Sequence, residues 1–196
     1  MMDFACRQGK QRWAHKTPDD CLYVDFFTRV FPDAKYIHLL RNPLDTALST
    51  NRIPPIRQGI SRWHEENILL EPNCAVRNTL FNCALRWRRW NDKIATHLQG
   101  FDARRVIYRA MVTEPERTFS ELFGFIDEPF SSQMLDLARN RSILPSWEWS
   151  SKEIRQAKGI TPDRFGRWKR ELTADKSRLL LSLAGGWEGM PMELAP

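Results

Sequence analysis

The chain alternates between short apolar runs and longer stretches with helical spacing. The clearest short run, Lys35 to Leu40, follows the turn signal Pro32-Asp33. A nearly continuous apolar run of this length predicts a strand that is buried on both faces, as in a parallel sheet. Arg41 comes directly after it, and Asn42-Pro43 then marks a helix start, with Asn as N-cap and Pro at the first helical position.

The helix that begins at Pro43 carries polar side chains along one face. Spacings of three and four residues place Asp45 or Thr46 beside Asn42, and Ser49 further along the same face. Ligands of open α/β sheets bind beyond the carboxyl ends of the strands, and helix N-termini attract anions. The order of strand, arginine, capped helix and hydroxyl therefore predicts an anion site.

Two further elements are expected before this junction. Arg12 to Lys16 could form a short strand, ended by Thr17-Pro18. A strand, a helix and a second strand would make a βαβ unit with parallel pairing and a right-handed crossover. The helical spacing between the two strands is carried by Leu22, Tyr23, Phe26, Phe27 and Val30.

Downstream of the junction the pattern is mostly helical. Cys74 to Leu98 carries a long apolar stripe, and Gly100 stops that helix. Arg105 to Tyr108 is a further strand candidate, and Thr113 to Glu116 contains a capping box with a proline in the first turn. The stripe consists of Leu80, Cys83, Ala84, Trp87, Ile94 and Leu98, with Arg86, Arg88, Arg89 and Lys93 mostly on other faces.

The carboxyl-terminal third of the chain predicts two helices separated by a loop. Ser131 or Ser132 caps a short helix, and Ser142 to Gly159 reads as a loop with aromatic anchors. Thr173 caps a last helix that ends at Gly185-Gly186. The full order, β-α-β-α-α-α-β-α-α-loop-α, predicts an α/β fold in which a parallel sheet is sandwiched between helices, within a single domain over residues 1–196.

Composition and charge narrow the class of protein. The chain has 196 residues, 42% hydrophobic and 28% charged, which suits one soluble globular domain. No apolar run approaches the roughly 20 residues of a membrane span, and the start of the chain lacks the apolar core of a signal peptide. We therefore expect a cytoplasmic protein. The net charge of +6 suggests a polyanionic partner or a small phosphorylated ligand.

The four cysteines show no metal-binding spacing. Cys6, Cys21, Cys74 and Cys83 contain no CxxC pair, so no metal site is expected. We interpret them as buried thiols in a reducing compartment, with a single disulfide as the alternative.

Four segments in order resemble those of sulfotransferases that use 3′-phosphoadenosine 5′-phosphosulfate (PAPS). Phe31 to Ser49 resembles the 3′-phosphate-binding segment, with Ser eight positions after Arg. Trp13 to Pro18 resembles a W-x-x-K-T-P segment, and Val106 to Pro115 resembles a "YEDLV…P" strand and helix start. Ile160 to Leu172 resembles the "GRWR" or "GDWK" region that closes over the nucleotide. The resemblance implies a P-loop NTPase-like, three-layer sulfotransferase fold.

The resemblance also implies roles for particular residues. Lys16 would stabilise the negative charge that builds up when a sulfuryl group moves from phosphate to a hydroxyl. Arg41 and Ser49 would bind the 3′-phosphate, and Tyr108 would lie close to the adenine. The remaining nucleotide-binding residues would be Gly166, Arg167, Trp168 and Lys169, with either Arg167 or Lys169 pairing with phosphate.

Each role has a structural alternative. Lys16 could be a solvated lysine, Tyr108 a core aromatic residue, and the segment from Gly166 to Lys169 a basic turn before a helix. His15 alternates with Lys16 along the predicted strand, so both cannot face one site, and we interpret His15 as a packed or hydrogen-bonded residue. We interpret His38, inside the buried strand, in the same way.

One family element is missing from the expected order. PAPS sulfotransferases begin with a strand and a glycine-containing loop that holds the 5′-phosphosulfate, and no such loop precedes Trp13. The chain therefore resembles the family fold with its amino-terminal portion removed. Two hypotheses follow: a sulfotransferase acting on a hydroxyl acceptor, or a non-catalytic nucleotide-binding remnant.

A third hypothesis, a nucleic-acid binder, rests on the positive charge and eight tryptophans, but the tryptophans are scattered and several fall on core stripes. The acceptor would be a small molecule, a carbohydrate or a protein tyrosine. Arg52 to Pro72 and Ser142 to Lys158 are the candidate acceptor segments, by elimination.

Overall fold

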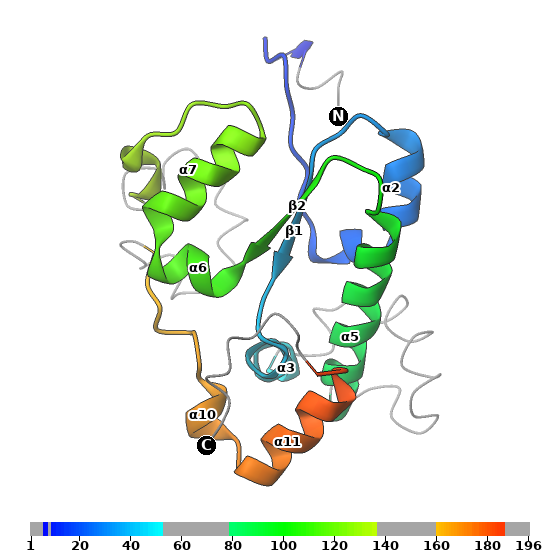
Figure 1. The fold of residues 1–196 in the computed structure, drawn as a ribbon, viewed down its shortest axis with the longest axis vertical. Helices are drawn as coiled ribbons and strands as arrows, with labels where there is room; N and C mark the ends of the chain where they lie inside the picture. Colours follow the sequence, from blue (N-terminus) through cyan, green and yellow to red (C-terminus); the bar gives the residue numbers. More distant parts are fainter. Residues whose placement is uncertain (1–5, 8, 53–78, 137–159, 187–196) are drawn as a thin grey trace.

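A computed structural model describes residues 6–7, 9–52, 79–136 and 160–186. Two short parallel strands lie among helices in this part of the chain (Figure 1). The elements are η1 (Pro18–Leu22), α2 (Val24–Val30), β1 (Tyr36–Leu40), α3 (Pro43–Asn51), α5 (Leu80–His97), β2 (Ala103–Ile107), α6 (Tyr108–Thr113), α7 (Pro115–Phe125), η3 (Ser132–Leu135), α10 (Trp168–Glu171) and α11 (Ala174–Leu183).

The strands β1 and β2 pair in parallel, which confirms the predicted parallel sheet, although the sequence did not indicate that these two strands are neighbours. Their register runs from Tyr36 opposite Ala103 to Leu40 opposite Ile107. Because the strands are parallel, their carboxyl ends lie at the same edge of the sheet. The sheet of the described residues therefore delivers the residues after Leu40 and after Ile107 to one place.

The predicted strand at Arg12 to Lys16 is wrong. These residues lie outside the described strand pair, so the expected βαβ unit around the helix of residues 22–30 does not form there. The segment is tied down by side chains instead: the Trp13 ring packs edge-on to Phe31, with centroids 5.3 Å apart, and Arg12 Nη1 lies 2.5 Å from Glu128 Oε1. A short run of mixed residues cannot signal whether a neighbouring strand is available to pair with it.

Strand β1 is buried on one face, not on both. His38 and Leu40 are buried, whereas Ile37 and Leu39 are 46% and 50% exposed. An apolar run alone does not say whether both faces of a strand are covered. Here α5 covers the buried face, and the Asn91 side chain on α5 makes a hydrogen bond with His38.

Helices flank the strand pair on two sides and close its carboxyl end. Figure 1 shows α6 and α7 on one side of the strands, α2 and α5 on the other, and α3, α10 and α11 beyond the strand ends. The core lies where α3, α5 and α11 meet, and there Leu44, Ala84 and Leu180 are buried. Partly buried Leu80, Trp168, Leu172, Leu181 and Leu183 pack around them.

Helix α5 follows the predicted stripe except at Asn82 and Arg86, which are buried although neither belongs to the stripe. The Thr79 side chain accepts a hydrogen bond from Asn82 N at 3.2 Å, and the chain leaves the helix toward Gly100, which has a φ of +83°. Arg86, expected away from the core stripe, is only 3% exposed. Its guanidinium donates to Cys83 Sγ at 3.4 Å and lies 5.5 Å from the Trp90 ring centroid. Helices packed on more than one side of α5 cover a wider arc than its apolar residues indicate.

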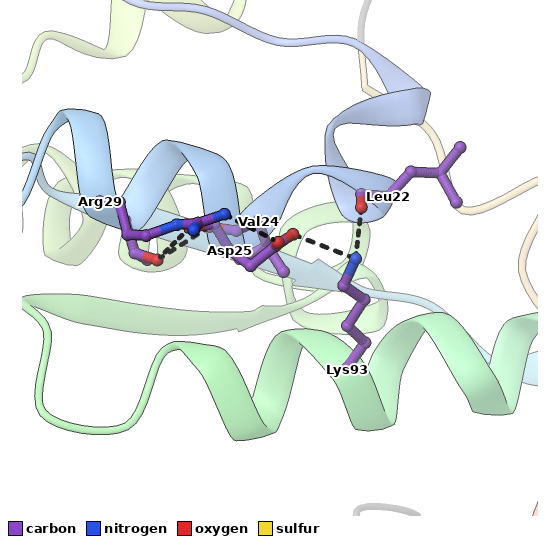
Figure 2. Close-up of polar contacts among 6 residues, drawn as sticks. Leu22, Val24, Asp25, Arg29 and Lys93 are labelled. Carbon is purple, nitrogen blue, oxygen red and sulfur yellow. Dashed lines mark hydrogen bonds and ion pairs between the residues drawn. The ribbon is translucent and has the colours of Figure 1, made fainter.

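Lys93 of α5 ties the amino-terminal helices to the rest of the domain (Figure 2). Its ammonium donates to the Leu22 carbonyl and lies 3.1 Å from Asp25 Oδ1. The hydrogen bond from Lys93 lowers the pKa of Asp25 below its ordinary value. The Arg29 side chain adds a hydrogen bond from Nε to the Asp25 carbonyl at 3.0 Å.

The later helix starts agree only in part with the sequence. Thr113 does not form the predicted capping box: it ends α6, and its hydroxyl donates to the Arg109 carbonyl at 3.0 Å. Helix α7 begins at Pro115 without a side-chain cap. Thr173 does cap α11, because its side chain accepts from Lys176 N at 3.4 Å.

No helix of the described residues is long and apolar enough to span a membrane, and none of their His, Cys, Asp and Glu side chains form a group that could hold a metal. No disulfide joins the described cysteines, Cys6, Cys21 and Cys83; Cys83 is buried as predicted, whereas Cys6 is exposed and Cys21 is half-buried.

His38 is hydrogen-bonded, as expected, and makes stability depend on pH. Its Nε2 lies 2.7 Å from Asn91 Oδ1, and Asn91 Nδ2 donates to the Trp87 carbonyl, so Nε2 must carry the proton. Burial lowers the pKa of His38 below its ordinary value of 6.5, and the hydrogen bond that His38 donates to Asn91 only partly opposes this. The unfolded chain therefore binds more protons between the two pKa values, and stability falls as the pH drops below about 6.5.

We predict that His38→Gln flattens this dependence, because glutamine keeps a donor but does not titrate. Urea unfolding between about pH 5 and pH 8 measures the difference in unfolding free energy between the two proteins. That difference should favour the wild type more strongly as the pH rises toward 6.5 and stay constant above it. A difference that is independent of pH would contradict a neutral buried imidazole.

Candidate functional site

The site is built where β1 ends and α3 begins. The Asn42 side chain caps α3, accepting from Leu44 N at 2.8 Å and from Asp45 N at 3.2 Å, and Pro43 takes the first helical position. The predicted helix start is confirmed. Strand and helix are separated by only Arg41 and Asn42, so the Arg41 backbone has little freedom in where it places its side chain.

Arg41 meets Tyr108 at the shared edge of the sheet. The guanidinium lies 4.7 Å from the centroid of the Tyr108 ring, within the range of a cation–π contact. Tyr108 is the first residue of α6 and follows β2 directly, so parallel pairing explains the meeting. The backbone of Arg41 is held as well, because its carbonyl accepts from Trp87 Nε1 at 3.0 Å.

A segment from the far end of the sequence completes this edge. Arg41 Nη2 donates to the Arg164 carbonyl at 2.9 Å. The buried carboxylate of Asp45 accepts from Gly166 N at 2.7 Å and from Trp168 N at 3.1 Å. Gly166 has a φ of +71°, a left-handed conformation in which a side chain would be strained. The structure thus brings four predicted site residues, Arg41, Tyr108, Gly166 and Trp168, into one contact network.

Sequence reasoning placed Asp45 on the polar face of its helix but assigned it no role. The available signal was an acidic residue in the first turn of a helix that begins at a predicted ligand site. Nothing in the local sequence indicates that its partners lie more than a hundred residues away.

Arg167 and Lys169 have different surroundings. The Arg167 side chain is 17% exposed, and its Nε lies 2.9 Å from Glu171 Oε1. Glu171 also pairs with Arg52 of the α3 C-cap at 2.8 Å. The hydrogen bond from Arg167 is the main reason that the pKa of Glu171 is lowered. Lys169 is exposed, with Nζ 5.8 Å from the Trp168 ring centroid.

Two buried guanidinium nitrogens suit an anion. Arg41 Nε and Arg167 Nη2 have no hydrogen-bond partner in the described part of the chain. A buried donor without a partner is costly, and a phosphate oxygen is the kind of acceptor that would satisfy it. The residues present therefore fit an anionic ligand.

Ser49 and Lys16 differ in their position relative to this network. Ser49 is half-buried and lies one turn beyond Asp45 on the same face of α3. Lys16 is exposed and lies in the segment before η1, outside the strand pair, and no contact seen among the described residues joins it to Arg41. His15 is hydrogen-bonded, as expected, with Nε2 3.0 Å from Asp20 Oδ1.

The predicted acceptor segments fall almost wholly outside the described residues, Arg52 excepted.

These features define an α/β protein with an anion-suited edge at the carboxyl ends of parallel strands. A family model described as "Sulfotransferase family" matches residues 2–132, and the chain belongs to that family. The match includes Lys16, Arg41, Ser49 and Tyr108 and ends before Gly166.

Individual relatives are distant. A protein of *Caenorhabditis elegans* named "Putative protein-tyrosine sulfotransferase" is 24% identical over 150 residues, which is 74% of this chain and 52% of that protein. An uncharacterized protein of *Aquifex aeolicus* is 26% identical over 159 residues, 81% of this chain and 19% of that protein. The chain thus spans about half or less of the curated relatives that it matches.

Among solved structures, the sulfotransferase domain from the curacin biosynthetic pathway is similar in fold. Its TM-score is 0.54 at 14% identity, covering 85% of this chain and 59% of that domain. This likeness supports the mixed fold with a parallel sheet.

The Asn42 cap should contribute measurably to stability. Replacing Asn42 by Ala removes the acceptor of two backbone N–H groups, and we predict a loss of about 1–2 kcal/mol in unfolding free energy. Asn42→Asp is the matched control, since it keeps a capping oxygen and should lose less. Urea denaturation measures both, and equal losses would contradict the capping role.

Proposed function

We propose that this chain binds PAPS and transfers its sulfuryl group to a hydroxyl acceptor. The observation that carries the proposal is the Arg41–Tyr108 contact next to the Gly166–Trp168 segment, at the carboxyl ends of two parallel strands. Sulfotransferase family membership gives the reaction class. The donor and the acceptor type are inferred from the residues and from the family resemblance.

The 3′-phosphate is assigned to Arg41 and Ser49. Arg41 still has a buried Nε that no described residue satisfies, and Ser49 can donate a hydroxyl hydrogen bond from α3, the helix that follows Arg41. Tyr108 would contact the adenine with the parts of its ring that the guanidinium leaves open. We extend the site to the Gly166–Lys169 segment, which supplies Arg167 and the Trp168 ring.

Between the two basic residues of that segment, Arg167 is the better phosphate ligand. It is mostly buried, and one of its terminal nitrogens has no partner within the described residues. Lys169 is exposed, so water competes with any ligand for its ammonium. Arg167 also presents a planar fork that matches phosphate geometry.

In the reaction, the bond between sulfur and the bridging phosphate oxygen breaks as the acceptor oxygen bonds to sulfur, and the acceptor proton passes to a base. Negative charge builds on the bridging oxygen, and the ammonium of Lys16 is assigned to stabilise it. The acceptor is a small molecule, a carbohydrate or a protein tyrosine. The name of the C. elegans relative favours testing tyrosine peptides first.

A second candidate is a non-catalytic nucleotide-binding protein of the same fold. The exposed position of Lys16, outside the strand pair, favours it. The two candidates differ in one readout. A non-catalytic protein would bind 3′-phosphoadenosine 5′-phosphate (PAP) but would form no sulfated product from PAPS and a hydroxyl acceptor.

The Arg41 assignment predicts a specific loss of affinity. Arg41→Ala should weaken PAP binding by roughly 1.5–3 kcal/mol, the range for a charge-assisted hydrogen bond. Isothermal titration calorimetry measures this, with Arg89→Ala, an exposed arginine of α5, as the charge-matched control. Absence of PAP binding by the folded wild type at millimolar concentration would overturn the proposed donor.

The two basic residues of the carboxyl-terminal segment should differ in how much they contribute to PAP affinity. Arg167→Ala should reduce PAP affinity about tenfold or more, while Lys169→Ala changes it by only a few-fold, because an exposed charge contributes little. Titration of both variants in the same buffer checks this. A larger loss for Lys169→Ala would reverse the assignment.

A further inference from the structure

We propose that Asp45 is a positioning residue, which fixes the Gly166–Trp168 segment against the first turn of α3 so that Arg167 and Arg41 line one pocket. Asp45 is 2% exposed, and both of its carboxylate oxygens accept a backbone N–H from this segment. No residue role assigned above accounts for this buried acid.

We call the two hydrogen bonds from Gly166 N and Trp168 N to the Asp45 side chain the latch, and the surroundings of Asp45 favour them. The residue lies in the first turn of α3, where the partial positive charge of the helix N-terminus favours an anion. Its bonds are charge-assisted and buried, and they take two N–H groups at the start of α10, one of which belongs to the first helical residue, Trp168.

Other polar ties to the same segment are weaker. Arg52 pairs with Glu171, but the Arg52 side chain is 61% exposed, and surface ion pairs contribute little. Arg41 reaches the Arg164 carbonyl with a single bond. Asp45 is therefore the polar contact that fixes the register between α3 and the segment.

The latch also constrains how the segment meets a ligand. The N–H groups of Gly166 and Trp168 are already donated to Asp45, so these two groups are not available to a phosphate bound at this place. Arg167 lies between the two latched residues, and its direction follows from theirs. This part of the inference rests on the proposed function, whereas the latch itself does not.

The first test uses the wild-type protein without ligand. Hydrogen exchange followed by NMR should show the amides of Gly166 and Trp168 protected about tenfold or more relative to the amide of Arg167, which makes no such bond to Asp45. Rapid exchange at both Gly166 and Trp168 would overturn the latch.

The second test is Asp45→Asn, which replaces one acceptor oxygen by an N–H₂ group facing a backbone N–H. We expect exchange of the Gly166 and Trp168 amides to accelerate about tenfold or more, with β1 and α5 unchanged, and PAP affinity to fall about tenfold. Asp163→Asn, which removes a carboxylate from the same part of the chain without touching the latch, is the control. Asp45→Glu keeps two acceptor oxygens and should recover part of the protection.

The outcomes distinguish a failure of the latch from a failure of the proposed function. Retained protection in Asp45→Asn overturns the latch. Lost protection without any PAP binding by the wild type keeps the latch and overturns the proposed function. Lost protection with unchanged PAP affinity overturns the positioning role. If Asp45→Asn loosens the whole chain, protection of these two amides in the wild type decides for or against the latch.

Discussion

Parallel pairing of β1 with β2 is the constraint on which the site depends. The carboxyl ends of both strands reach one edge, so Arg41 and Tyr108 meet although 66 residues separate them in the sequence. An antiparallel arrangement of the same strands would send these residues to opposite ends. The site is therefore a consequence of strand direction before it is a consequence of side-chain chemistry.

A series of hydrogen bonds to α5 holds this edge of the sheet in place. His38 donates to Asn91, Asn91 donates to the Trp87 carbonyl, and the Trp87 indole donates to the Arg41 carbonyl. One turn of α5 thus supports both the buried face of β1 and the residue that follows the strand. Burial of His38 as a neutral imidazole is compatible with these hydrogen bonds, because the neutral tautomer with its proton on Nε2 can still donate to Asn91.

Acidic and basic side chains lie close together where α3 meets the carboxyl-terminal segment. Arg41 and Arg167 each have a buried nitrogen without a partner among the described residues, while Asp45 and Glu171 are occupied. The acidic groups accept hydrogen bonds from the protein, whereas each of the two basic groups keeps one nitrogen without a partner among the described residues, which leaves the edge favourable to an anion. This distribution, together with membership of the sulfotransferase family, supports the proposal of a phosphorylated donor.

The sequence alone determined the local events: the strand at residues 36–40, the Asn42-Pro43 helix start and the Thr173 cap, together with the parallel direction of the sheet. These follow from neighbouring residues, through hydrophobic period, capping chemistry and the strand–helix–strand order. The resemblance to sulfotransferases added candidate ligands, of which the structure gathers Arg41, Tyr108, Gly166 and Trp168.

Only the tertiary structure decided what depends on distant partners. Residues 12–16 lack a strand to pair with in the described sheet, β1 is covered on one face, and Arg86 is buried by helices that its own sequence does not reveal. The role of Asp45 belongs to the same class, since its hydrogen-bond donors lie in a segment 121 and 123 residues away. Pattern along a chain reports which surfaces must be buried, but the identity of what covers them is a property of the folded molecule.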